Sequence, residues 1–487
     1  MTPRVKKGAS ISQNSVRLYR GADPSQRDRH TILPVAQDTR HAVDGYTHDR
    51  MLRFGRLLWG NVGFVRGAIA EIATYAVGQR FQPQFCGKDV EWGTVAEYEL
   101  SKWMQICDVR GQPFNWNKDL WLAIISALRD GDVLMVMTQT ESGYPQIQFI
   151  PAHRIGSRGA MLVESGPYRG LGCCNGVIYN PHGRAVAYQI TGESPEKDTY
   201  VSARDAALIF NPEWVDQGRG ITALASVIND HVDIDDITAF EKFAAKLFAS
   251  QTLIEHHEGD PISDDAERFT EGQGTNSEQL WEDFEGGMIR KYRAGSNSKI
   301  EAFMQQRPTP NLMAFRRELM RGTYASLQWP IEFSYDASTL TSGAIRMVIG
   351  KSIRTIELYQ GMVIPAATRA VQYAVARLMK LKLIPFNEEW YRWGFQMPSK
   401  PTVDVGREAQ QAREDFKMGL RTAQHIYAEQ GLDWREEFDQ RVAEAKYLAD
   451  AAAAAGVPLS MVQTDTSVNN APKPEEKEEE DEKPASK

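Results

Sequence analysis

Hydrophobic residues recur at helical spacing along two long segments in the second half of the chain. The first segment opens at Pro308 and carries apolar positions at Leu312, Phe315, Leu319, Tyr324 and Leu327. The second carries one apolar stripe over about 35 residues, or about 50 Å at 1.5 Å per residue. Its members are Ile345, Ile349, Ile353, Ile356, Val363, Ala367, Val371, Val375 and Leu378. The pattern predicts two long helices joined by an irregular segment.

Prolines and small polar residues predict where these helices end and bend. Trp329 and Pro330 stop the first helix. Four hydroxyl side chains can cap the second helix, namely Ser338, Thr339, Thr341 and Ser342. Pro365 cannot donate a hydrogen bond to the carbonyl of Gly361, so we predict a bend there. On these residues alone, an ordinary helix-loop-helix core element is the simplest interpretation.

The first half of the chain predicts a mixture of helices and short strands. Residues 1–47 are polar without an apolar period and predict a flexible N-terminal arm. Helical patterns follow at 51–78, in two pieces around Gly60 and Asn61, and at 95–107 and 117–129. Strands separated by turn residues are predicted at 133–138, 147–150, 176–179, 185–191 and 207–210. The fold class expected is therefore α+β, mainly helical.

A third long helix is predicted at 221–255, with one apolar and one acidic face. The apolar side chains, expected inside, are Leu224, Ile228, Ile234, Ile237, Phe240, Ala244 and Leu247. The acidic side chains, expected outside, are Asp230, Asp233, Asp235, Asp236 and Glu241. Beyond it, 288–292 and 299–303 predict a hairpin. Helices are predicted at 406–419, 422–430 and 434–455, and the like-charge run at 475–482 predicts a disordered acidic tail.

Composition and charge narrow the class of protein. The chain has 487 residues, of which 42% are hydrophobic and 25% charged, as is typical of a globular protein with several domains. No run of 18 uncharged apolar residues and no signal peptide stand in the sequence, so we expect synthesis in the cytoplasm and no membrane segment. A net charge of -8 argues against a protein that grips nucleic acid over its whole surface. The cysteines, Cys86, Cys107, Cys173 and Cys174, lack metal spacing and are expected to be reduced.

The sequence gives little support for catalysis. His256 and His257 stand near Glu258 and Asp260, but adjacent histidines do not easily face one metal ion. Neither a phosphate-binding Gly-x-x-x-x-Gly-Lys-Ser/Thr loop nor a Gly-x-Ser-x-Gly elbow is present. The densest acidic group comprises Asp233, Asp235 and Asp236, of which only the first and last share a helix face. We therefore predict no catalytic residue, metal or cofactor.

Several segments, in their order along the chain, resemble the lambda family of phage portal proteins. Arg129-Asp-Gly-Asp-Val-Leu134 is similar to the family segment in which a helix ends and a strand begins, and Ile147-Gln-Phe-Ile-Pro-Ala-His-Arg-Ile155 to the strand that follows. Gly176 to Tyr188 resembles its hairpin with Gly-Arg at the turn, and Gln217-Gly-Arg-Gly-Ile221 its entry to the first long helix, although Thr222 replaces the expected Pro. Ser334-Tyr-Asp-Ala-Ser-Thr339 and Gly431-Leu-Asp-Trp434 carry the likeness further, so that it covers about residues 48 to 456.

The resemblance implies a portal architecture with wing, long-helix stem, small α/β clip and helical crown. It divides the chain as follows: wing 48–220, first stem helix 221–255, clip 256–307, second stem helix 308–327, tunnel loop 328–343, kinked wing helix and return 344–400, crown 401–456, and acidic tail 457–487. Such a protein forms a ring, usually of twelve subunits, at one capsid vertex of the virion. Double-stranded DNA enters and leaves through it, and it meets the large terminase, the head-tail adaptor, and the major capsid and scaffolding proteins.

The same resemblance suggests which side chains serve the channel. The tunnel loop and its flanks would contribute Trp329, Tyr335, Ser338, Thr339, Thr341, Arg346, Lys351 and Arg354. The stem would contribute Arg316, Arg317, Arg321, Asp230, Asp233 and Glu241, and the clip Arg290, Lys291, Arg293 and Lys299. The stem arginines could equally pair with the acidic helix. Two alternatives remain, another virion connector component and a cytoplasmic nucleic-acid enzyme with an acidic metal site.

Overall fold

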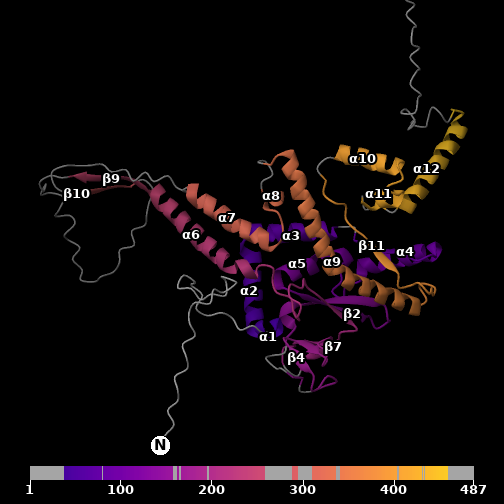
Figure 1. Cartoon of the computed structure of the whole chain (residues 1–487), viewed down its shortest axis with the longest axis horizontal. Coiled ribbons are helices and arrows are strands. Elements are labelled where there is room, and N and C mark those ends of the chain that lie inside the picture. Colours follow the sequence, from indigo (N-terminus) through magenta and orange to yellow (C-terminus); the bar gives the residue numbers. More distant parts are fainter. Residues whose placement is uncertain are drawn as a thin grey trace, which may run out of the picture.

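The computed structural model describes residues 38–78, 81–156, 162–163, 166–194, 197–257, 288–293, 310–335, 340–402, 405–429, 432 and 434–458. A body of helices and small antiparallel sheets forms the centre of the described chain (Figure 1). A helical hairpin leaves the body on one side, and three further helices lie on the other (Figure 1). The fold is α+β and mainly helical, as predicted.

The N-terminal helices of the body begin where short polar side chains cap them. They are α1 (Thr39–Ala42), α2 (Gly45–Asn61), α3 (Gly63–Val77), α4 (Val90–Ile106) and α5 (Trp116–Asp130). Side-chain oxygens of Asp44, Asp89 and Asn115 accept backbone N–H groups in the first turns of α2, α4 and α5. The helices predicted within 51–129 and the break near Asn61 are thus confirmed, whereas the predicted end of the flexible arm at 47 was wrong, because α1 and the start of α2 precede it.

Four small sheets complete the described structure. The strands are β1 (Gln82–Phe85), β2 (Val133–Gln139), β3 (Pro145–Pro151), β4 (Gly172–Cys174), β5 (Val177–Tyr179), β6 (Ala185–Ile190), β7 (Thr199–Ser202), β8 (Ala206–Ile209), β9 (Gln251–His257), β10 (Met288–Arg293) and β11 (Trp393–Gln396). Antiparallel sheets have the orders β3-β2-β8, β4-β5-β6-β7 and β1-β11, whereas β9 and β10 pair in parallel. The five strands predicted between 133 and 210 are confirmed, and β4 and β7 were not predicted.

The 39-residue helix α9 (Ser342–Lys380) runs through the centre of the body. It packs against α3, α4 and α5 and against strands of two sheets. Its predicted stripe is confirmed, because Ile356, Val363, Ala367, Val371 and Leu378 are all buried in the main core. The helix continues through Pro365, and its axis changes direction along its length (Figure 1).

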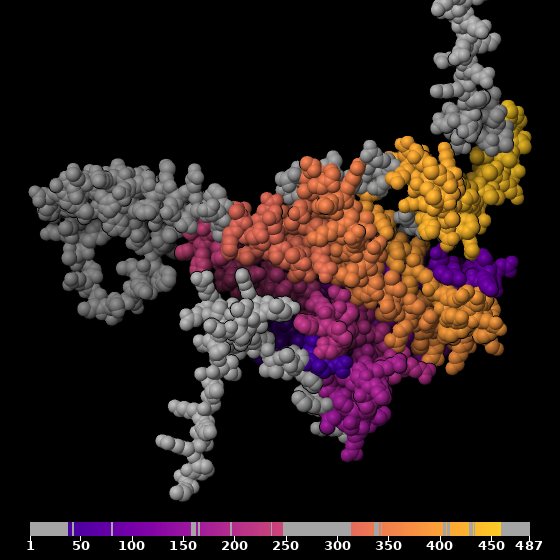
Figure 2. All heavy atoms as spheres, viewed as in Figure 1, coloured from indigo at the N-terminus to yellow at the C-terminus, as the bar shows by residue number. Residues whose placement is uncertain are grey.

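The hairpin consists of α6 (Ile228–Ser250) and α7 (Pro310–Ser326), and β9 and β10 lie at its far end (Figure 1). The short helix α8 (Ile331–Ser334) then leads from α7 to α9. In Figure 2, the surface of α7 continues into that of α9, which lies between the hairpin and the last helices. These last helices, α10 (Val405–Lys417), α11 (Ala423–Glu429) and α12 (Trp434–Ala455), confirm the C-terminal prediction.

Both predicted ends of the first helix of the helical hairpin were wrong. The helix expected at 221–255 begins only at Ile228, after a short 3-10 turn at Ala225–Val227, and ends at Ser250, where β9 starts. A separate β-hairpin was predicted from strands at 288–292 and 299–303. Only its first strand, β10, lies in the described chain, and β10 pairs with β9 in parallel. Residues 299–303 lie outside the described residues.

Candidate functional site

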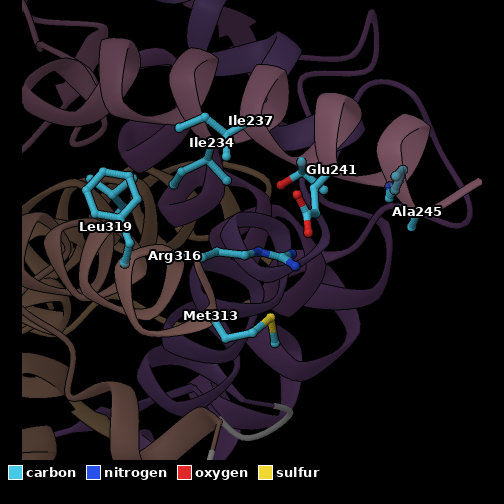
Figure 3. A pocket seen from close by; sticks show the side chains of 10 residues that line it. Ile234, Ile237, Glu241, Ala245, Met313, Arg316 and Leu319 are labelled. Carbon is cyan, nitrogen blue, oxygen red and sulfur yellow. The ribbon is translucent and has the colours of Figure 1, made fainter. Parts of the chain in front are cut away.

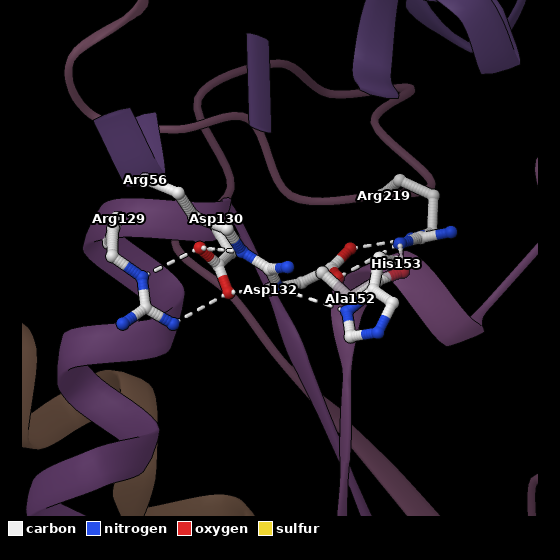
Figure 4. A network of polar contacts seen from close by, with 7 residues as sticks. All are labelled: Arg56, Arg129, Asp130, Asp132, Ala152, His153 and Arg219. Atoms are coloured by element: carbon white, nitrogen blue, oxygen red, sulfur yellow. Dashed lines mark hydrogen bonds and ion pairs between the residues drawn. The ribbon is translucent and has the colours of Figure 1, made fainter. Parts of the chain in front are cut away.

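The chain enters the hairpin at Arg219, whose guanidinium is buried and fully hydrogen-bonded (Figure 4). Its Nε and Nη2 donate to the two carboxylate oxygens of Asp132 at 2.5 and 3.0 Å. Its remaining N–H groups donate to the carbonyl oxygens of Ile155, Asn175 and Ala152 at 2.8, 2.6 and 3.0 Å. All five donors of the side chain are therefore used. One arginine thus joins the root of the hairpin to two sheets of the body.

A second polar cluster lies beside the first, around Asp130 (Figure 4). Arg56 and Arg129 each donate two hydrogen bonds to its carboxylate, at 2.7 to 3.1 Å. Burial raises the pKa of Asp130, but the hydrogen bonds from Arg129 and Arg56 outweigh it, so the pKa lies below its ordinary value. Arg56 also donates to Nδ1 of His153 at 2.9 Å, and burial and the Arg56 charge lower the pKa of that histidine. The cluster is therefore held as carboxylate, arginines and neutral imidazole.

Two glycines let two backbone segments cross at close range, namely the segment that leads into β2 and the segment that leads toward α6. A Cβ at Gly131 would lie 2.6 Å from the carbonyl oxygen of Gly220, and a Cβ at Gly220 would lie 1.9 Å from that of Gly131. Gly131 also has φ 101°, which favours glycine. Next to the crossing, buried His48 donates from Nε2 to the Gly220 carbonyl at 3.0 Å, and burial and the Arg219 charge lower its pKa. The direction in which the hairpin leaves the body is thus fixed by close backbone packing.

Helices α6 and α7 contact each other closely only near the body. There, His231 Nε2 and the hydroxyl of Thr323 form a buried hydrogen bond at 2.8 Å. Farther out, a groove with a volume of about 210 Å³ opens between the two helices, and Figure 3 shows its lining side chains. Its apolar lining comprises Ile234, Ile237, Ala245, Met313, Phe315 and Leu319. The outer half of the hairpin is therefore incompletely packed in a single chain.

The polar residues of the groove differ from their predicted placement. Glu241, expected outside on the acidic face, lines the groove and is half-buried. The Arg316 side chain runs across the groove toward it (Figure 3), and pairing of the stem arginines with the acidic helix stays a prediction. The Arg316 Nε atom is buried and has no hydrogen-bond partner among the residues that the structure describes. Among the other stem residues, Arg321 pairs with Glu318 of its own helix at 3.2 Å, and Asp233 is exposed.

The face of α6 opposite the groove is exposed, although the apolar pattern predicted part of it to be buried. Phe240, expected inside, is 73% exposed, and Phe243 is 68% exposed. Val232 lies on the same face and is 41% exposed, whereas Ile234 is buried as predicted. The inward face of α6 is thus narrower than its apolar pattern suggested, because in the described part of the chain the helix packs laterally mainly against α7 and α2.

The turn between α7 and α9 is fixed to the body by Trp329. This side chain is 2% exposed, and its indole N–H donates to Ser334 Oγ at 2.8 Å and faces Glu71 of α3 at 3.3 Å. Ser334 Oγ donates in turn to Glu71. Trp329 was predicted to line the channel, and that prediction was wrong, because a buried side chain cannot meet a polymer passing outside.

From the other side, α9 holds the end of α7. Thr355 Oγ1 donates to the Gln328 carbonyl at 2.7 Å, and the Tyr359 hydroxyl donates to the Leu327 carbonyl at 3.1 Å. These carbonyls stand at a helix end, where no intrahelical partner is available. The segment that follows begins with Tyr335, which is 62% exposed. The flank of the predicted tunnel loop is therefore rigid where it leaves the body.

The other predicted channel residues fall into two groups. Arg346, Lys351 and Arg354 are exposed on the first half of α9, and none of them forms an ion pair with another described residue. Thr341 is exposed at the start of α9. Ser338 and Thr339 lie outside the described residues, as does Lys299 of the predicted clip. Arg290, Lys291 and Arg293 are in β10, which pairs with β9.

Metal-binding clusters, membrane-spanning helices and disulfides are other features that could indicate a function. The described part of the chain holds no group of three or more His, Cys, Asp or Glu side chains that could bind a metal ion. No described helix is both long and apolar enough to span a membrane. All four cysteines are free thiols.

The arginine at the root is the functional residue that sequence reasoning missed. The segments around Asp132 and around Arg219 were both singled out, but separately. A buried pair of opposite charges is the usual reason for a carboxylate and a guanidinium to occur in otherwise apolar surroundings. That consideration could have suggested the contact.

Comparison with known proteins gives a family match over most of the chain. A family model described as "Phage portal protein, lambda family" matches residues 41–360. No curated protein matches the chain. Similar solved structures include "Neck of empty GTA particle computed with C6 symmetry", with TM-score 0.42 and 13% identity over 79% of this chain and 93% of that chain. "Virion of native gene transfer agent (GTA) particle" gives 0.40 and 14% over 81% and 99%, and "Neck of native GTA particle computed with C12 symmetry" gives 0.41 and 12% over 79% and 93%.

Proposed function

Because the chain belongs to the lambda family of phage portal proteins, we propose that it forms a ring-shaped channel at one capsid vertex, through which DNA is packaged and ejected. The matched segment, residues 41–360, includes α2 to α5 and β1 to β8 of the body, the α6–α7 hairpin and the first half of α9. The family is one of structural proteins. In this role the chain itself hydrolyses no nucleotide, and the energy for packaging comes from a terminase partner.

The observation that carries the proposal is the hairpin and the way it is rooted. α6 leaves the body at a fixed angle set by Arg219, Asp132 and the Gly131–Gly220 crossing. α7 returns to a turn that Trp329 and α9 hold rigidly. A ring wall needs such an element, because a projecting hairpin of constant orientation can be repeated around an axis. In this proposal the hairpin is the stem, and residues 256–307 form the clip that docks the terminase and later the head-tail adaptor.

The charges of the chain suit a conduit for DNA. A channel has to guide a polyanion without holding it tightly, and a saturating basic wall would arrest it. The chain combines a net charge of -8 with a few exposed cations, among them Arg346, Lys351 and Arg354 on α9. We assign these three side chains to the DNA path, with Tyr335 and Thr341 beside them and residues 328–343 as the tunnel loop.

The remaining segments are assigned by position along the chain. The helices α10 to α12 would be the crown on the side facing the capsid interior, and the body the wing that meets the major capsid and scaffolding proteins. The protein would act in the virion after synthesis in the host cytoplasm, without a membrane stage and without a cofactor.

The proposal is tested by weighing the purified protein with native mass spectrometry and imaging the same sample in negative stain. Twelve copies of the 54.8 kDa chain amount to about 660 kDa, and such a mass with a central hole is the expected result. A stable monomer or dimer at every salt concentration would contradict the proposal.

A further inference from the structure

The hairpin carries two unusual apolar surfaces on opposite faces of the same helix. One is the groove between α6 and α7, lined on the α6 side by Ile234, Ile237 and Ala245. The other, here called the ridge, consists of Val232, Phe240 and Phe243, exposed by 41, 73 and 68%. At about 100° per residue, the centres of the groove face and the ridge lie roughly 180° apart around α6. A single chain leaves both surfaces open to water.

The two surfaces match each other in size. The groove has a volume of about 210 Å³, and an engineered apolar cavity of about 150 Å³ already accepts a benzene molecule. One phenylalanine ring therefore fits in the groove. The ridge presents two such rings, three residues apart on α6 and so adjacent on one helix face.

The charges match as well. Asp236 is exposed on the ridge face, one turn from Phe240. The groove has exposed Lys242 at its edge, and inside it Arg316 runs toward Glu241, although the Arg316 Nε atom lacks a hydrogen-bond partner among the described residues (Figure 3). A buried donor without an acceptor costs free energy, so an occupant that brings an acceptor is favoured. An aromatic ring with an acidic side chain beside it supplies both the apolar group that fits the groove and the acceptor for Arg316.

We propose that the ridge of one subunit inserts a phenylalanine ring into the α6–α7 groove of the next subunit, with Asp236 placed toward Arg316 and Lys242. This inference rests on the proposed ring and names the contact that builds it. A head-to-tail ring needs two different complementary surfaces on each subunit, and surfaces on opposite faces of one helix allow many copies to close around an axis. Pairing of like surfaces in a two-fold dimer would set groove against groove and leave both unfilled.

The first test compares assembly of three variants of the full chain by native mass spectrometry. Phe240→Ala with Phe243→Ala removes the ridge, and Ala245→Trp fills the groove from within its own chain. Each is expected to raise the concentration needed for half-assembly at least about 100-fold, because each subunit contact loses buried aromatic surface. Phe386→Ala removes a phenylalanine that is 76% exposed elsewhere and should assemble like the wild type. Thermal unfolding of the dilute proteins checks that all of the variants fold.

The second test identifies which surfaces meet. In a background with exposed Cys86 replaced by Ser, Phe243→Cys and Thr238→Cys are placed on one chain and oxidised with diamide. The two positions face opposite sides of α6, so a disulfide between them forms only between subunits, and a ladder of linked oligomers is expected. Either cysteine alone should give no ladder.

The outcomes separate this inference from the proposed ring. If the wild type forms rings and the ridge variant assembles equally well, or the doubly substituted chain gives no ladder, the ridge and groove do not pair and only this inference is overturned. If the wild type stays monomeric, the ring and the inference both fail. Loss of assembly in the ridge and groove variants, together with the ladder, supports both.

Discussion

Arg219 and Asp132 lie 87 residues apart in the sequence and form a buried, two-pronged ion pair at the root of the hairpin. The side chain of Asp132 is fully buried and that of Arg219 is 5% exposed, so water compensates neither charge. The carboxylate also accepts the Gly220 N–H at 2.9 Å. The pair therefore sets the position of the chain where it leaves the body.

Replacing this arginine should destabilise the protein strongly. Arg219→Ala leaves the buried Asp132 carboxylate without its opposite charge and removes the guanidinium donors from three carbonyls, and breaking a buried pair in this way costs about 3–5 kcal/mol. Arg219→Lys keeps the charge but cannot supply the planar set of five donors. Its unfolding temperature should therefore lie between those of the wild type and Arg219→Ala. Thermal unfolding measures both.

A matched control uses an exposed arginine of a neighbouring helix. Arg53 pairs with Asp49 at 2.7 Å, but their side chains are 77% and 44% exposed. Arg53→Ala should change stability by less than about 1 kcal/mol. An Arg219→Ala protein that unfolds at the same temperature as Arg53→Ala would show that the root does not depend on the pair.

The stability of the body should fall as the pH rises from about 4 to about 8 because of Asp119. Burial and the nearby Asp108 charge raise the pKa of Asp119 to about 8, while Arg110 donates to both carboxylates. The folded-state pKa lies above the value in the unfolded chain, so the folded protein binds this proton more tightly. The stabilisation is therefore complete below about pH 4 and is lost as the pH rises toward about 8.

Asp119→Asn removes this dependence. We expect the variant to unfold a few degrees above the wild type near pH 8.5 and at about the same temperature near pH 4. Glu193→Gln, at an exposed ion pair with Lys197, should follow the wild type at both pH values. Parallel curves for wild type and Asp119→Asn across this range would contradict the raised pKa.

Trp329 should matter for stability and not for contact with a passing polymer. Trp329→Ala empties a buried site beside Phe333 and Tyr75, at a cost of about 3–5 kcal/mol. Trp329→Phe keeps a ring and loses the indole donor, so a loss of about 1 kcal/mol is expected. Exposed Tyr335→Ala serves as control and should leave the unfolding temperature unchanged. Equal stability of Trp329→Ala and Tyr335→Ala would be evidence against this anchor.

Local patterns in the sequence were sufficient for most helices. The apolar stripe of α9 is encoded by residues that recur every three or four positions, so its prediction needed no tertiary information. The strands β2, β3, β5, β6 and β8 were likewise bounded by turn residues. The sequence therefore predicted the mainly helical α+β class.

Long-range contacts decided the parts that were predicted wrongly. Residues 221–227 have a helical pattern, but Thr222 Oγ1 and the Ala223 N–H both donate to the Leu128 carbonyl, at 3.1 and 3.0 Å, and hold this stretch against α5. Likewise, β9 has an apolar pattern compatible with a helix and becomes a strand through pairing with β10. The burial of Trp329 depends on Glu71, which is 258 residues away. No window of sequence contains these partners.

The three exposed cations of α9 provide the test of the proposed DNA path. Arg346→Gln, Lys351→Gln and Arg354→Gln together leave buried contacts untouched, so rings should still form. If these side chains meet phosphates, the variant ring should bind short duplex DNA about tenfold more weakly at low salt, and its affinity should depend less steeply on salt. DNA packaging into capsids should slow for the same reason. The matched control replaces three cations in exposed ion pairs, Arg53, Lys197 and Arg392, by Gln and removes the same total charge. An equal loss of affinity in both variants would mean that net charge alone matters and that α9 does not line the path.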